Sequence, residues 1–121
     1  MQSFEIPGRL PGQNDMTQAN RSHRYAGSSQ KKKWTTVVHL AALAAGIKPG
    51  GRCSIRYRWY EPNRRRDLDN IRSGSKFILD GLVMAGVLED DGWRVITGLE
   101  DTFSVDKKNP RIIVEIIEEP K

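Results

Sequence analysis

The stretch that decides the fold runs from Arg52 to Tyr60 and reads RCSIRYRWY. Its side chains alternate with a period of two residues, which is typical of a strand that buries one of its faces. The inward set is Cys53, Ile55, Tyr57 and Trp59, and the outward set is Arg52, Ser54, Arg56 and Arg58. A planar guanidinium bonds two phosphate oxygens at once. We therefore predict a half-buried strand whose outward arginines, Arg56 and Arg58, are candidate contacts for a polyanion.

The residues before this strand predict a short strand, a long loop and a helix. Phe4 to Pro7 fits the strand, and the polar segment from Pro7 to about Ser29, which has no apolar period, fits the loop. A helix capped by Ser28 or Ser29 then runs to Gly46. Its apolar stripe, at helical spacing, is Trp34, Val37, Val38, Ala41, Ala42 and Ala45.

Three consecutive lysines, Lys31, Lys32 and Lys33, fall in the predicted first turn of this helix. Positive charge at a helix N-terminus opposes the helix dipole, so helix stability does not explain the cluster. Two interpretations stay open: a surface that binds phosphate, and a solvated charged face.

The residues after Tyr60 predict a second helix and two more strands. Apolar spacing from Phe77 to Ala85 indicates the helix, and Trp93 to Val105 fits a long strand. A turn at 107–110 then leads to Ile112–Ile117, which we predict to be the returning strand of a hairpin. The order β-α-β-α-β-β indicates the α+β class, with a mixed sheet and two helices in a single compact domain over residues 1–121.

The charge is distributed unevenly along the chain. The net charge is +5, but residues 1–66 carry 13 Lys/Arg against 3 Asp/Glu, and residues 67–121 carry 7 against 12, so the balances are +10 and −5. A basic half beside an acidic half is typical of a polyanion-binding surface next to a cation-binding site. A soluble protein with an uneven surface charge is the alternative.

Several classes of protein are not indicated. No stretch approaches the roughly 18 apolar residues of a membrane span, and the first residues do not resemble a signal peptide, so a cytoplasmic location is expected. The single Cys53 has no partner for a disulfide within the chain, nor for a zinc site with His23 and His39.

Four aspartates are candidate metal ligands. Asp67 and Asp69 are two residues apart, and in extended backbone, which Pro62-Asn63 and the arginine run favour, both carboxylates face the same side. Asp90 and Asp91 follow the second helix, so the connection at 87–91 would have to double back to bring them near the first pair. Carboxylates without His or Cys form an all-oxygen site, which selects Mg²⁺ or Mn²⁺ over zinc.

A bound divalent metal polarises a phosphoryl oxygen and lowers the pKa of its water. Lys76, on the first turns of the predicted second helix, could orient the attacking water, stabilise the charge on the phosphorane or protonate the leaving oxygen. The cations Arg64, Arg65 and Arg66 directly precede Asp67. Three arginines exceed what two carboxylates need, and a phosphate substrate accounts for the excess.

A purely structural interpretation of the same residues stays open. Asp67 and Asp69 could be a helix N-cap and a first-turn acid. Asp90-Asp91-Gly92 could be a turn, and Lys76 could pair with Asp80 four residues further along the helix.

Four blocks of the sequence follow one another in a recognisable order: PGRLPGQN at 7–14, RRDLDN at 65–70, KFILDGL at 76–82, and AGV at 85–87 followed by DD at 90–91. Together they resemble the RusA family of Holliday-junction resolvases, which are endodeoxyribonucleases of bacteria and phages. The resemblance covers most of the chain and is strongest from Arg65 to Asp91. Residues 71–75 make the segment before Lys76 a few residues longer than in the best-known member.

The resemblance implies a homodimeric, Mg²⁺-dependent enzyme that resolves four-way DNA junctions by paired symmetric nicks. The essential aspartates of the family fall on Asp67, Asp69 and Asp91, its essential lysine falls on Lys76, and Asp90 matches a neighbouring acid. A junction has approximate two-fold symmetry, and a two-fold dimer presents two sites related by the same operator. Two other functions remain open: a non-catalytic nucleic-acid-binding module, and a nuclease that acts on flaps or forks.

Overall fold

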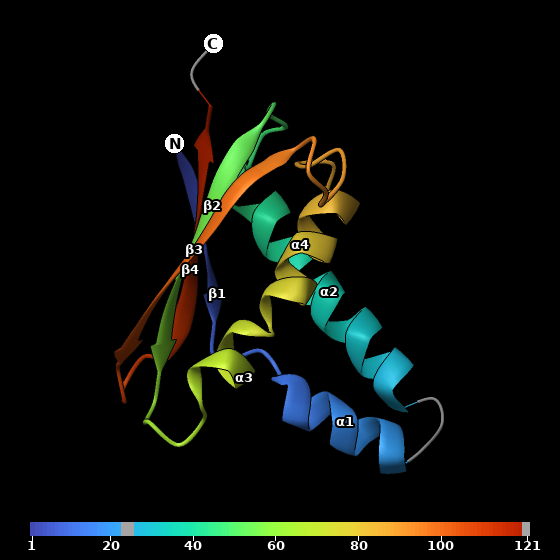
Figure 1. Cartoon of the computed structure of the whole chain (residues 1–121), viewed down its shortest axis with the longest axis vertical. Coiled ribbons are helices and arrows are strands. Elements are labelled where there is room, and N and C mark those ends of the chain that lie inside the picture. The colour runs from blue at the N-terminus through green and yellow to red at the C-terminus, as the bar shows by residue number, and fades with distance from the viewer. Residues whose placement is uncertain (23–25, 120–121) are drawn as a thin grey trace.

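Four strands form one mixed sheet, and the helices lie on one of its faces (Figure 1). The computed structural model describes residues 1–22 and 26–119. The strands are β1 (Gln2–Pro7), β2 (Cys53–Glu61), β3 (Ile96–Val105) and β4 (Arg111–Glu118), and the described helices are α1 (Gln13–Ser22), α2 (Ala26–Ala44), α3 (Leu68–Arg72) and α4 (Ser75–Met84). The order across the sheet is β1-β4-β2-β3, with β2 and β3 parallel and the other pairs antiparallel. The predicted α+β class with a mixed sheet is confirmed.

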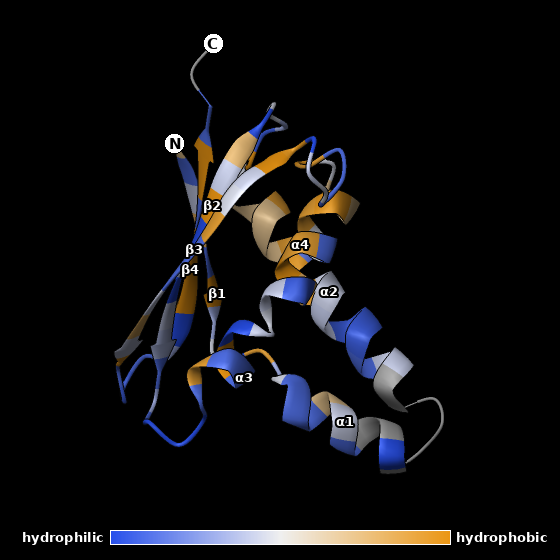
Figure 2. Cartoon of the chain, in the orientation of Figure 1, coloured by the Kyte–Doolittle hydropathy of each residue, from blue (hydrophilic) through white to orange (hydrophobic). Residues whose placement is uncertain are grey.

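Strand β2 has the predicted alternation. Its inward side chains are buried, and Trp59, Tyr57 and Ile55 are among the largest fully buried side chains of the protein. They belong to one core cluster with apolar residues of β1, β4, α2 and α4, including Phe4, Ile6, Val38, Phe77, Ile78, Leu82, Ile112, Val114 and Ile116. Figure 2 shows α4 as mainly hydrophobic, whereas α1 is mainly hydrophilic.

The predicted hairpin of the last two strands is wrong. Strand β4 lies between β1 and β2 and is antiparallel to both, while β3 pairs with the far side of β2 in parallel. Burial explains the difference, because β4 is rich in buried side chains and suits the middle of the sheet, whereas most of β3 is polar or exposed. Strand β3 also begins at Ile96 rather than Trp93, since the amides of Val95 and Ile96 bond to the carbonyl of Gly92 in a turn.

The predicted loop before α2 contains helix α1, which the absence of an apolar period concealed. Its first amides are bonded by distant side chains: Gln13 N–H donates to Ser73 Oγ (2.8 Å) and Asn14 N–H donates to Asn70 Oδ1 (3.1 Å). Residues about 60 positions downstream therefore stabilise the helix end, where unbonded amides would otherwise remain. Residues 23–25 of the predicted loop lie outside the described residues.

Helix α2 begins at Ala26, before the predicted caps Ser28 and Ser29, which are therefore inside it. The three lysines at 31–33 consequently lie in its second turn and not in its first. Helix α2 packs closely on α4 at Gly81, where an added Cβ would lie 2.6 Å from Val38 Cβ and 3.0 Å from the carbonyl oxygen of Thr35. None of the helices in the ranges 1–22 and 26–119 has the length and apolar character to cross a membrane.

Candidate functional site

Lys76 joins two carboxylates at the surface of α4. The helix places Asp80 one turn after Lys76, and Lys76 Nζ lies 3.2 Å from Asp80 Oδ1 and 3.2 Å from Asp91 Oδ2. The carboxylates of Asp80 and Asp91 raise the pKa of the Lys76 amine above its usual range, so that it remains an ammonium at neutral pH. The structure therefore brings together Lys76 and Asp91, which are 15 residues apart in the sequence.

The connection after α4 doubles back and brings Asp91 to Lys76, although it does not gather Asp90 and Asp91 into one cluster with Asp67 and Asp69. Gly86 ends the helix in the left-handed conformation, with φ +76°, which suits a residue without a Cβ. Its amide and that of Val87 bond to the carbonyls of Val83 and Leu82. Val87 and Leu88 are buried and anchor the returning chain. Asp90 and Asp91 then emerge beside the helix, where Arg94 lies 3.7 Å from Asp90.

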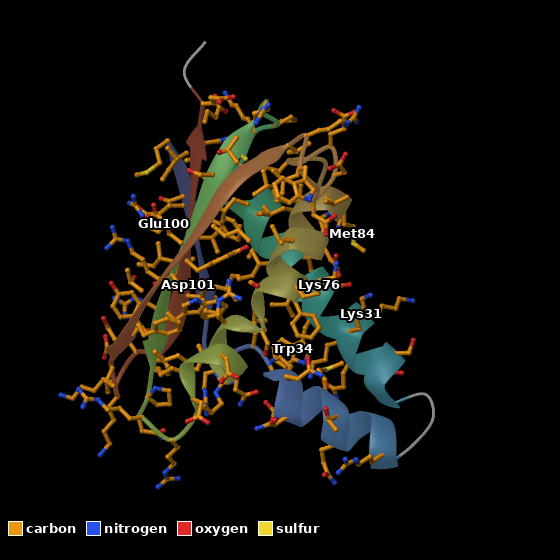
Figure 3. All side chains as sticks on the ribbon, in the orientation of Figure 1. Lys31, Trp34, Lys76, Met84, Glu100 and Asp101 are labelled. Carbon is orange, nitrogen blue, oxygen red and sulfur yellow. The ribbon has the colours of Figure 1, made fainter. Side chains whose placement is uncertain are left out.

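A pocket of about 500 Å³ lies beside this ion-pair cluster, between α2 and α4. Three aspartates and two lysines line it together with four other residues: Asp80, Asp90, Asp91, Lys31, Lys32, Ser28, Thr35, Val83 and Met84. Lys31 Nζ is 3.9 Å from Asp80 Oδ2. Figure 3 shows Lys31, Lys76 and Met84 on the helical side of the molecule, away from Glu100 on β3. Acidic and basic side chains therefore share one opening, which suits a phosphate group accompanied by a cation.

The other predicted pair of aspartates lies elsewhere. Asp67 is the N-cap residue of α3 and Asp69 lies in its first turn, so the prediction of extended backbone through both residues is wrong and the helix-start alternative describes their position. Asp67 has extended dihedral angles but makes no capping bond, and Asp69 accepts a hydrogen bond from the amide of Asn70. The segment at 71–75 forms the end of α3, the turn at 73–74 and the first residue of α4.

The four predicted ligands do not form one carboxylate cluster. Asp67 lines a second cavity of about 750 Å³ together with Glu61 and Asp101, whereas Asp90 and Asp91 line the pocket between α2 and α4. Across the described ranges, no three Asp, Glu, His or Cys side chains are grouped closely enough to hold a metal ion. The donor type, carboxylate oxygen, suits Mg²⁺, but the arrangement of all four aspartates does not.

The arginine run before Asp67 divides into two kinds of side chain. Arg64 and Arg65 are exposed, as a DNA contact requires. Arg66 is turned inward: its guanidinium donates to both oxygens of Glu61 (3.0 and 2.9 Å) and to the carbonyl of Leu10 (3.1 Å). Glu61, which is 5% exposed, was not recognised as its partner from the sequence, because only the fold brings Leu10 and Glu61 to Arg66.

The two outward arginines of β2 also have protein partners. Arg58 Nε lies 2.6 Å from Glu115 Oε1, and Arg56 lies 3.1 Å from Glu100 and 3.5 Å from Glu115. The Arg58 guanidinium lowers the pKa of Glu115 below its usual range. Alternation places both arginines on the sheet face opposite the helices, so the sheet separates them from Lys76.

The lysines of α2 differ in their surroundings. Lys31 and Lys32 line the pocket, whereas Lys33 Nζ lies 4.9 Å from the centre of the Trp34 ring. Two pocket residues were not predicted as functional. Asp80 was considered only as a helical partner of Lys76, and Thr35 was hidden within the apolar stripe of α2. A polar residue inside such a stripe is the signal that could have identified it.

Comparison with protein-family models gives no match to this chain, and comparison of its sequence with the curated proteins gives none either.

Proposed function

We propose that the chain is a Mg²⁺-dependent endodeoxyribonuclease that resolves four-way DNA junctions by paired symmetric nicks. One observation carries the proposal: Lys76 Nζ lies 3.2 Å from Asp91 Oδ2, beside a pocket lined by Asp90, Lys31 and Lys32. These residues are the lysine and acids that the resemblance to the RusA family implies, together with two predicted phosphate contacts. Enzymes that transfer phosphoryl groups commonly combine a lysine with carboxylates that bind a metal ion, and both cations stabilise the charge of the transition state.

The protein groups have distinct tasks in this proposal. Lys31 and Lys32 bind the phosphate next to the pocket, and the exposed Arg64 and Arg65 follow the DNA backbone. Lys76, as an ammonium, stabilises the negative charge that grows on the phosphorane or donates a proton to the leaving 3′ or 5′ oxygen. Asp91 accepts a hydrogen bond from Lys76 and is a candidate ligand of the divalent metal. The divalent metal, when bound, supplies Lewis-acid polarisation and a more acidic water.

A homodimer and branched DNA are part of the same proposal. Resolution of a junction requires two opposed nicks, and a two-fold dimer supplies two sites with the symmetry of the junction. The basic residues 1–66, with a balance of +10, supply long-range attraction to the phosphates.

The proposal is tested with a labelled four-way junction in Mg²⁺. We expect the wild type to cut opposed strands, and Asp91→Asn to lose at least about 100-fold in rate, the cost typical of losing a general acid-base or charge-stabilising contact. Junction binding by Asp91→Asn should be unchanged or tighter, since a negative charge is removed. Asp106→Asn, in the turn before β4, is the matched control and should cut like the wild type. Binding without cutting in both Mg²⁺ and Mn²⁺ would refute the nuclease.

A second function is favoured by two observations. The described residues hold no group of three potential metal ligands, and Asp67 and Asp69 occupy the start of α3. Both facts suit a nucleic-acid-binding module without catalysis, which the same experiment identifies by retention of the junction without nicks. A nuclease for flaps or forks is distinguished by its cutting rates on those substrates relative to the junction.

A further inference from the structure

Two buried polar atoms at the pocket between α2 and α4 have no hydrogen-bond partner. They are Thr35 Oγ1 and Asp80 Oδ2, and within the described ranges Tyr57 is the only other residue with such an atom. Both residues line the pocket, and Thr35 is only 5% exposed. Burial of a polar atom without a hydrogen-bond partner costs free energy and requires a specific explanation. A bound ion or an ordered water can provide the partner.

The surrounding structure holds these two residues close to each other. Gly81, the neighbour of Asp80, lies so near α2 that an added Cβ would be 3.0 Å from the Thr35 carbonyl oxygen. Thr35 on α2 is buried, and both Thr35 and Asp80 line the same pocket. The close approach of α2 and α4 thus places a hydroxyl and a carboxylate in the lining of one pocket.

The acceptors at this site suit a cation. Asp80 Oδ1 and Asp91 Oδ2 each lie 3.2 Å from Lys76 Nζ, so two carboxylates already surround one positive group. The ammonium of Lys31 lies 3.9 Å from Asp80 Oδ2, which is beyond hydrogen-bond length. Lys76 and Lys31 have exposed side chains that can turn toward solvent. Protein-bound Mg²⁺ usually keeps several waters and is held by one or two carboxylates, the number that Asp80 and Asp91 supply.

We propose that Asp80, Asp91 and Thr35 form a divalent-cation site in the pocket between α2 and α4. Asp80 and Asp91 are its carboxylate ligands, and the Thr35 hydroxyl bonds either to the ion or to one of its waters. On binding, Lys76 is displaced from between the carboxylates and directed toward the phosphate. The site differs from the set implied by the family resemblance, because Asp80 takes the place of the α3 acids Asp67 and Asp69. Its role in catalysis rests on the proposed function, whereas its existence does not.

The test measures binding of Mn²⁺ alone, without DNA, from the loss of the free-ion electron paramagnetic resonance signal. We expect Asp80→Asn to weaken Mn²⁺ binding by about tenfold or more, as is typical when a ligand or its supporting contact is removed. The isosteric Thr35→Val should weaken it by a smaller factor. Asp106→Asn is the control for a general loss of negative charge and should bind like the wild type.

The inference is overturned if the wild type does not bind Mn²⁺, or if Asp80→Asn binds it as tightly as the wild type. Thermal unfolding without metal checks that each variant is folded. If Asp80→Asn fails to fold, Asp91→Asn takes its place with the same expected result, because Asp91 lies in an exposed connection. Cleavage of the junction is scored separately: Mn²⁺ binding through Asp80 without cutting would sustain the site and refute the nuclease.

Discussion

Arg66 serves three acceptors at once, two oxygens of Glu61 and the carbonyl of Leu10. It ties the segment before α1 to the end of β2, and it fixes the backbone immediately before Asp67. Its side chain is 14% exposed and that of Glu61 is 7% exposed. Removing one member of such a buried pair costs more than the pair contributes, because the other charge is left without a partner.

We expect Arg66→Ala to lower the free energy of unfolding by roughly 3 kcal/mol, the cost of leaving a buried carboxylate with one partner fewer. The remaining contact from Arg9, at 3.1 Å, moderates the loss. Urea denaturation measures it. Arg65→Ala, at an exposed neighbour, should change stability by less than about 0.5 kcal/mol. Equal stability of the two variants would contradict the structural role of Arg66.

Lys32 and Arg58 are a matched pair for DNA binding, since both were predicted to contact phosphate. Arg58 is paired with Glu115, whereas Lys32 lines the pocket. We expect Lys32→Ala to reduce the slope of log affinity for DNA against log salt by about 0.9, one phosphate contact. Arg58→Ala should leave that slope unchanged. A slope that changes only with Arg58 would place the DNA on the opposite face of the sheet.

At the scale of elements, the ion pairs across β2, β3 and β4 make stability depend on pH. The pKa of Glu115 is lowered in the folded state by the hydrogen bond and charge of Arg58. The stabilisation is therefore complete above the ordinary glutamate pKa of 4.5 and is lost as the pH falls through the lower folded-state value.

Unfolding by urea at a series of pH values tests this linkage. The wild type should lose stability below about pH 4.5 more steeply than Glu115→Gln, since glutamine does not titrate and has no folded-state shift to lose. Asp106, whose pKa is also lowered, by Arg111, contributes in both proteins and cancels in the comparison. Parallel curves for the two proteins would assign the acid sensitivity to other groups.

Elements whose secondary structure is encoded by the spacing of their own residues were predictable from the sequence. Alternation in β2 and apolar spacing in α4 identified both, because each buries one face of its own. Helix α1 was not predictable in this way, since Ser73 and Asn70 bond its first amides and only the fold brings them there. The position of β4 also depends on distant partners, β1 and β2. The prediction that β4 pairs with β3, its neighbour in the sequence, was therefore wrong.

The candidate site was predictable in part for the same reason. Lys76 and Asp91 were identified from motifs, and the return of the chain at Gly86 brings them together. The inward turn of Arg66 depends on Glu61, and the orphaned Thr35 hydroxyl depends on how closely α2 approaches α4. Neither of these contacts can be recognised from the spacing of residues in the sequence.

The proposed dimer predicts the mass of the protein in solution and how the two opposed DNA strands of a junction are cut. Sedimentation should give about twice the 13.7 kDa subunit mass. Dimers refolded from equal amounts of wild type and Asp91→Asn should include a mixed species that nicks one strand of a junction and leaves the opposed strand intact. If the mixture makes only paired nicks, as the wild-type dimers alone would, the two sites do not act separately. A monomer mass in sedimentation would refute the dimer.

The central position of β4 determines when the sheet can be completed during synthesis. Strand β1 is hydrogen-bonded to β4, with Gln2 opposite Ile116 and Pro7 opposite Arg111. Residues 2–7 leave the ribosome before residues 111–118 and stay without their strand partner until those residues have followed them. The helices, whose hydrogen bonds are local, can form earlier. Closing so long a segment is slow. Until β4 arrives, a nascent chain leaves one hydrogen-bonding edge of β2 unpaired, and that interval is when a chaperone would be needed most.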